Sequence, residues 1–65
     1  MITVNGRTME LDGPASVAAI LKMHNFAADR VVVEKNMEIV AQKEYESTLL
    51  YDGDNLEILQ FVGGG

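Results

Sequence analysis

The stretch MITVNGRTMEL, residues 1–11, decides the fold because it has the pattern of a β-hairpin closed at Asn5-Gly6. A type I′ turn needs positive φ at both central residues, and Asn-Gly is the strongest short signal for such a turn. With this two-residue turn, Val4 faces Arg7 across the hairpin. One face then carries the apolar side chains: Ile2, Val4, Met9 and Leu11. The turn and the alternation therefore predict the same hairpin.

A helix is expected after the break DGPAS at residues 12–16. Ser16 is a good N-cap for VAAILKMHNF, residues 17–26, so the helix should run for about ten residues. Asn25 can end it in the left-handed conformation, so that Phe26 folds back onto the last turn. The spacing of the segment gives the helix one core-facing side: Val17, Ile20, Leu21 and His24.

Three later segments have strand patterns and two have turn patterns. The expected strands are RVVVEK at 30–35, NMEIVAQ at 36–42 and NLEILQFV at 55–62. KEYEST at 43–48 is expected to form a short helical turn, and DGD at 52–54 a tight turn. The turn at Asn36-Met37, between the first two of these strands, is weaker than Asn-Gly because methionine disfavours positive φ.

This order of elements, β-β-α-β-β-turn-β, lets one main helix cover one face of a mixed sheet. The crossover that contains the helix is expected to make the first and last strands central and parallel. The pattern predicts an α+β protein and also allows a small α+β roll of another kind. The order of the elements resembles the ubiquitin-like β-grasp architecture, which we expect here. We expect a single β-grasp domain over residues 1–62, followed by a flexible glycine tail over residues 63–65.

Composition excludes several classes of partner and site. The net charge is −5, from ten acidic and five basic residues. This balance argues against nucleic acid and against an anionic membrane surface as partners. Without cysteine, and with His24 as its one histidine, the chain forms no disulfide and is a poor candidate for a metal site. We see no signal peptide and no apolar run of membrane-spanning length, so we expect a cytoplasmic protein.

Side chains that could perform catalysis are few. His24 lies on an apolar helix face, and we interpret it as a residue at the edge of the core rather than a base or ligand. Asp52 and Asp54 could hold a cation, but the turn preferences of aspartate favour a structural turn. Glu34 and Glu38 could form a binding patch, although solvated strand and turn acids are the simpler interpretation.

The glycines at the end of the chain remain as the candidate working part. The reactive group there is the carboxylate of Gly65, which could acylate sulfur or an amine once ATP had adenylated it. Three extended glycines, Gly63 to Gly65, span roughly 10 Å and fit a narrow channel in another protein. Ordering them costs about 1–2 kcal/mol per residue, which docking of the domain must offset. Phe61 and Val62 are candidates for that docking. A cloning remnant or a frayed end, in either case without function, is the alternative.

The chain resembles the ThiS-type sulfur carrier proteins of thiamine biosynthesis. The likeness covers the whole chain and is carried by the following stretches: ITVNG, SVAAIL, VVVEKN followed by EIV, and YDGDNLEILQFVGGG. There are three departures. Met37 stands where members often carry glycine, His24 where leucine is frequent, and Tyr45 where tryptophan is common. None of them touches the tail.

The resemblance implies a protein cosubstrate rather than an enzyme, with no bound cofactor. Gly65 would be adenylated by a ThiF-like adenylyltransferase, which uses ATP, while Gly63 and Gly64 thread into its active site. Sulfur relayed from a cysteine desulfurase would then give a thiocarboxylate. With no cysteine for a persulfide, Gly65 is the place where this chain could carry sulfur. The acceptor would be a ThiG-like thiazole synthase.

The tail by itself leaves other functions open. A MoaD-like carrier for molybdopterin synthesis and a ubiquitin-like protein modifier use the same chemistry up to the adenylate. An interaction module with an inert tail belongs to a different class. Deletion of Gly64 and Gly65 would separate that module from the other three.

Overall fold

The computed structural model of the chain describes residues 1–61 and opens with the predicted hairpin. Strand β1 (Ile2–Val4) pairs antiparallel with β2 (Arg7–Met9), and Val4 lies opposite Arg7 as expected. The two turn residues, Asn5 and Gly6, have φ values of 50° and 82°, which is the type I′ geometry. The turn and the register of the hairpin are confirmed.

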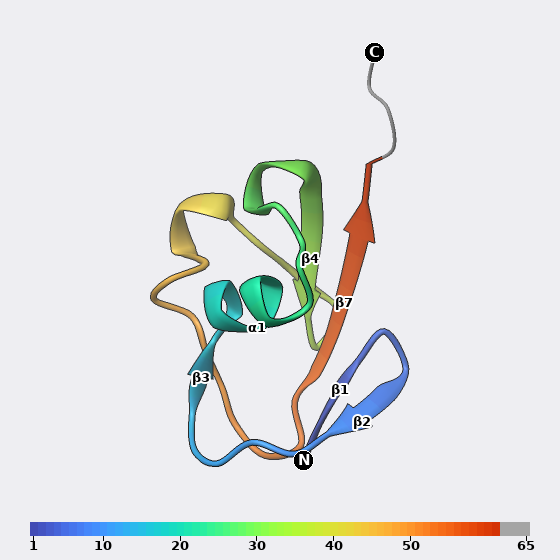
Figure 1. The fold of residues 1–65 in the computed structure, drawn as a ribbon, viewed down its shortest axis with the longest axis vertical. Helices are drawn as coiled ribbons and strands as arrows, with labels where there is room; N and C mark the ends of the chain where they lie inside the picture. Colours follow the sequence, from blue (N-terminus) through green and yellow to red (C-terminus); the bar gives the residue numbers. More distant parts are fainter. Residues whose placement is uncertain (62–65) are drawn as a thin grey trace.

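The main sheet is mixed and has the strand order β2-β1-β7-β4-β5 (Figure 1). Its other strands are β4 (Val31–Lys35), β5 (Glu38–Val40) and β7 (Asn55–Gln60). Strand β7 runs parallel to β1 and antiparallel to β4. The first and last strands are therefore central and parallel, as predicted.

The hairpin of β4 and β5 closes on a two-residue turn in spite of its weak turn sequence. Lys35 lies opposite Glu38, so only Asn36 and Met37 form the loop. Both have positive φ, 51° for Asn36 and 72° for Met37. An L-residue with a long side chain pays a steric cost in this left-handed region. The Met37 side chain is 86% exposed and has little packing to offset that cost.

Helix α1 (Val17–Met23) is shorter than the predicted length of about ten residues. It ends in a Schellman motif. Phe26 N–H donates to the Leu21 carbonyl at 2.8 Å, and Asn25 N–H donates to the Lys22 carbonyl at 3.1 Å. Asn25 has a φ of 63°, as the left-handed cap requires. The prediction that His24 extends the core-facing side is wrong, because His24 is the exposed C-cap.

Two short strands that the sequence did not predict hold the start of the helix. Strand β3 (Ala15–Ser16) pairs with β6 (Leu49–Leu50) beside the main sheet. The first N–H groups of a helix have no partner within it. Here Val17 and Ala18 donate to the carbonyls of Thr48 and Tyr45, and Ser16 Oγ accepts from Ala19 as the predicted N-cap.

The remaining short elements are 3-10 helices. One is η1 (Ala28–Arg30), which precedes β4, and the other is η2 (Gln42–Glu44), which overlaps the helical turn predicted at 43–48. Within the described part of the chain, no helix has the length and apolar character needed to cross a membrane.

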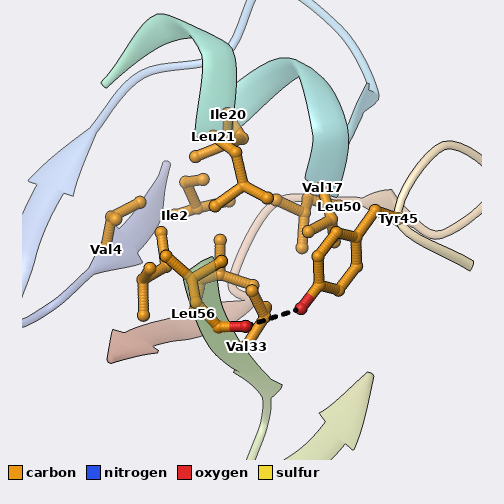
Figure 2. Packing of buried hydrophobic residues seen from close by; sticks show 11 residues of the cluster. Ile2, Val4, Val17, Ile20, Leu21, Val33, Tyr45, Leu50 and Leu56 are labelled. Carbon is orange, nitrogen blue, oxygen red and sulfur yellow. Dashed lines mark hydrogen bonds between the residues drawn. The ribbon is translucent and has the colours of Figure 1, made fainter. Parts of the chain in front are cut away.

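The core lies between α1 and one face of the sheet (Figure 2). Strands β1, β4, β6 and β7 contribute buried side chains, as do helix α1 and Tyr45. The buried side chains are Ile2, Val4, Val17, Ile20, Leu21, Val31, Val33, Tyr45, Leu50, Leu56 and Ile58. The Tyr45 hydroxyl donates to the Val31 carbonyl at 3.4 Å, and burial raises the pKa of this hydroxyl. One main helix on one face of a mixed sheet is the predicted β-grasp fold.

Candidate functional site

The candidate site is the end of β7, from which the predicted tail begins. On the β4 side, Val31 lies opposite Gln60, and Phe61 N–H donates to the Arg30 carbonyl at 2.9 Å. The pairing therefore holds the backbone up to Phe61, the last described residue. The predictions made for Val62 and for residues 63–65 lie outside the described part of the chain.

On the β1 side, a side chain continues the pairing after β1 has ended. Asn5 N–H donates to the Leu56 carbonyl at 2.9 Å. The Asn5 side chain then accepts from Ile58 N–H at 2.7 Å and donates to the Ile58 carbonyl at 3.2 Å. Strand β7 is thus fixed on both sides within three residues of Phe61, so the tail starts from a firmly placed base.

The sheet face away from α1, which we call the outer face, carries exposed apolar side chains near this base. Since Leu56 and Ile58 point into the core, Leu59 points to the outer face. Leu59 is 59% exposed and lies opposite Val32 on β4. Phe61 continues the row and is 60% exposed, which suits the docking role predicted for it without testing that role.

The outer face also carries two glutamates, but not the two that the sequence suggested. Glu34 lies opposite Ile39, so it shares the outer face with that residue, whereas the neighbouring Glu38 belongs to the other side of the sheet. The patch suggested for Glu34 and Glu38 is therefore wrong. Instead, Glu34 lies directly opposite Glu57 of β7. Sequence reasoning missed Glu57, because this pairing joins strands far apart in the chain.

The aspartates of the DGD segment form the predicted tight turn. Asp54 N–H donates to the Tyr51 carbonyl at 3.0 Å, and Asp54 Oδ2 accepts from Tyr51 N–H at 2.8 Å. The side chain of Asn36 donates to Asp54 Oδ1 at 3.0 Å, and Lys35 Nζ lies 3.7 Å from Oδ2. The hydrogen bond from Asn36 is the largest of several effects that hold the pKa of Asp54 below its usual range. The hydrogen bond from Tyr51 N–H and the charge of Lys35 act in the same direction. Asp52 is exposed and pairs with the amino group of Met1.

His24 has no catalytic surroundings. It is exposed and lines an open pocket of about 390 Å³ between the first hairpin and the end of α1, together with Arg7 and Phe26. Within residues 1–61, no three acidic or histidine side chains gather in a metal-binding arrangement.

The fold and the firmly based C-terminal strand define the chain as a β-grasp protein. The family model described as the ThiS family matches residues 2–65, and the chain belongs to this family. The crystal structure of the thiamine biosynthesis protein ThiS from Geobacter metallireducens superimposes with a TM-score of 0.81 at 37% identity, over 98% of this chain and 97% of that one.

Two relatives by sequence differ in length. The sulfur carrier protein ThiS of Bacillus subtilis is 32% identical over the full length of both chains. A thiazole synthase of Paramagnetospirillum magneticum is 36% identical over 98% of this chain. The chain spans only 20% of the length of that synthase, so the similarity concerns one part of a larger protein.

Proposed function

We propose that this chain, a ThiS-type sulfur carrier of thiamine biosynthesis, carries its sulfur on the C-terminal carboxylate of Gly65. The observation that carries the proposal is the match of the family over residues 2–65, which includes the glycines as well as the folded domain. A ThiS family member is a carrier acted on by other proteins rather than a catalyst. We place its reactions in the cytoplasm, which the absence of cysteine fits.

The chemistry follows from the poor reactivity of a carboxylate. A Gly65 oxygen attacks the α-phosphate of ATP in the active site of a ThiF-like adenylyltransferase, and pyrophosphate leaves. A persulfide relayed from a cysteine desulfurase then attacks the acyl carbon and displaces AMP, which gives an acyl disulfide. A thiol reduces this bond, which leaves the thiocarboxylate on Gly65 and a disulfide on the reductant. Gly63 and Gly64 have no Cβ and therefore suit the narrow channel that this chemistry needs.

The proposed sulfur acceptor is a ThiG-like thiazole synthase. The similarity to one part of a protein named thiazole synthase supports this choice. A carrier domain and a synthase domain that are joined in one polypeptide are held close enough to act on each other. The base of the tail supports it too: β7 is paired on both sides up to Ile58 and on the β4 side up to Phe61. A fixed base lets docking of the domain direct a short tail.

An intact mass spectrum tests the proposal. The chain is incubated with ATP, the ThiF-like enzyme, a cysteine desulfurase, cysteine and a thiol reductant. We expect the mass gain that corresponds to replacing one oxygen by sulfur, and no gain when Gly65 is deleted. A chain that stays unmodified, while the same enzymes modify another carrier, would contradict the proposal.

A further inference from the structure

Asn5 is followed by the residue that makes an asparagine chemically least stable. The backbone nitrogen of the next residue can attack the side-chain amide carbon, and a glycine leaves that nitrogen least hindered because it has no Cβ. Asn5 precedes glycine, whereas the other three asparagines of the chain precede phenylalanine, methionine and leucine. Gly6 is exposed, and apart from its chain neighbours no heavy atom lies within 4 Å of the position that a Cβ would take there. The surroundings of Gly6 therefore do not obstruct the attack.

The side chain of Asn5, in contrast, is held against β7. Its Oδ1 accepts from Ile58 N–H at 2.7 Å, and its Nδ2 donates to the Ile58 carbonyl at 3.2 Å. The backbone N–H of Asn5 also donates to the Leu56 carbonyl at 2.9 Å. Attack by the Gly6 nitrogen requires the amide carbon to turn from Ile58 toward Gly6, which breaks both side-chain bonds. The contact with Ile58 thus shields the amide.

We propose that Asn5 is a deamidation site that Ile58 shields in the folded chain, and that its modification loosens the end of β7. When the side chain leaves Ile58, a base takes the proton of Gly6 N–H. The nitrogen forms a bond to Cγ of Asn5, the bond from Cγ to Nδ2 breaks, and Nδ2 takes up a proton and leaves as ammonia. Water then opens the cyclic imide at either carbonyl, which gives aspartate or isoaspartate at position 5.

The product no longer matches the groups of Ile58. A carboxylate can accept from Ile58 N–H, but it has no hydrogen to donate to the Ile58 carbonyl, so two acceptors face each other. A partly buried carbonyl that loses its donor costs stability. Isoaspartate also adds a carbon to the backbone of the turn, which disturbs the pairing of Val4 with Arg7. Modification therefore weakens the contact that delays it, and the base of the tail loses its support on the β1 side.

Peptide mapping by mass spectrometry measures the reaction at each asparagine separately. Cleavage after lysine and arginine puts Asn5, Asn25, Asn36 and Asn55 into four different peptides. The full-length chain is kept in mildly alkaline buffer, folded in one sample and unfolded by guanidinium chloride in the other. We expect Asn5 to lose ammonia at least about tenfold more slowly in the folded sample, since opening of the site costs free energy. Equal rates in the two samples would overturn the proposal.

Phe26→Gly provides a matched site within the same molecule. It creates a second Asn-Gly pair at Asn25, which has a positive φ of 63° but forms no side-chain hydrogen bond within residues 1–61. Under conditions where circular dichroism shows this variant folded, Asn25 should lose ammonia at least about tenfold faster than Asn5. Both sites belong to one chain, so a general loss of stability affects them alike. Equal rates at the two sites would show that Ile58 gives no protection.

Asn5→Asp tests the effect of the modification on β7. Asp-Gly also suits a type I′ turn, so the backbone of the hairpin is kept. The melting temperature should fall by about 4–10 °C, because the Ile58 carbonyl loses its donor. Gln42→Glu makes the same exchange of amide for carboxylate at an exposed residue and should melt with the wild type. Equal melting temperatures for wild type and Asn5→Asp would overturn the loosening of β7. None of these measurements involves the tail, so their outcome is independent of the test for a thiocarboxylate.

Discussion

The side chain of Asn5 takes the place of a strand residue beside Ile58. It accepts a hydrogen bond from Ile58 N–H and donates one to the Ile58 carbonyl, at 2.7 and 3.2 Å. Strand β1 cannot do this with its backbone, since the chain turns back at Asn5 and Gly6. One asparagine therefore closes the hairpin and also extends the pairing of β7 toward the tail.

Asn5→Gly should lower the free energy of unfolding by about 1–3 kcal/mol, because partly buried groups of Ile58 lose their partners. Glycine tolerates the positive φ of this position, so the decrease in the free energy of unfolding measures the contribution of the two Asn5 hydrogen bonds. Asn5→Ala should cost a further 1–2 kcal/mol or so, because alanine is strained at a φ of 50°. Urea unfolding followed by circular dichroism measures both differences.

Asn25→Gly is the matched control for this prediction. Asn25 also has a positive φ, 63°, and its side chain forms no hydrogen bond within residues 1–61. The same exchange of asparagine for glycine should therefore change stability much less at this position. Equal losses for Asn5→Gly and Asn25→Gly would show that the Ile58 contacts contribute nothing.

Met37→Gly should stabilise the protein by about 0.5–1 kcal/mol. Relief of the left-handed strain outweighs the greater freedom that glycine gives the unfolded chain. Met37→Ala removes the same exposed side chain but keeps the strain of a φ of 72°, so it serves as the control. Thermal unfolding should place Met37→Gly several degrees above Met37→Ala. The two variants would melt together if the turn were unstrained.

Asp54 should make stability depend on pH in the acid range. Its folded-state pKa is lowered, chiefly by the hydrogen bond from Asn36, so the unfolded chain binds a proton first as the pH falls. This contribution is complete above about pH 4 and disappears as the pH falls through the lower folded-state pKa. Unfolding free energies should show wild type more stable than Asp54→Asn at neutral pH, with the gap narrowing below pH 4 or so. Curves for wild type and Asp54→Asn that stay parallel through the acid range would contradict this prediction.

The parts of this fold that local chemistry determines could be predicted from the sequence. Asn5-Gly6 sets the first hairpin, Ser16 starts α1, and the alternation of NLEILQ gives β7 its buried face. The pairing of β3 with β6 could not be predicted, because two-residue strands carry no periodic pattern. Their position depends on how the later loop packs against the helix.

The candidate site divides in the same way. That Phe61 precedes the glycines is evident from the chain itself, whereas the meeting of Glu34 with Glu57 depends on the register of β4 against β7. That register follows from packing of the valines of β4 against the core and not from any signal near either glutamate. The hydrogen bonds from the Asn5 side chain to Ile58 could not be predicted either, because the positive φ of the turn is already a sufficient reason for an asparagine at this position.

Tyr45 should affect stability at alkaline pH. Burial raises the folded-state pKa of its hydroxyl, so the folded protein keeps a proton that the unfolded chain has lost. The contribution is complete below about pH 10 and disappears as the pH rises through the raised folded-state pKa. The wild type should therefore lose stability above pH 10 or so more steeply than Tyr45→Phe. Tyr51→Phe, at a tyrosine that is 53% exposed, is the control, and parallel curves for wild type and Tyr45→Phe would contradict the prediction.

Deletion of Gly64 and Gly65 should separate function from folding. Glycine has no side chain to bury, and the buried core residues found within residues 1–61 lie between Ile2 and Ile58. The melting temperature should therefore stay close to that of the full chain, while formation of the thiocarboxylate is abolished. The Asn5→Gly variant should behave in the opposite way, losing stability while keeping the group that is modified. A truncated chain that melts many degrees lower would place these glycines in the fold, and the case for a tail that acts only in a partner's active site would be lost.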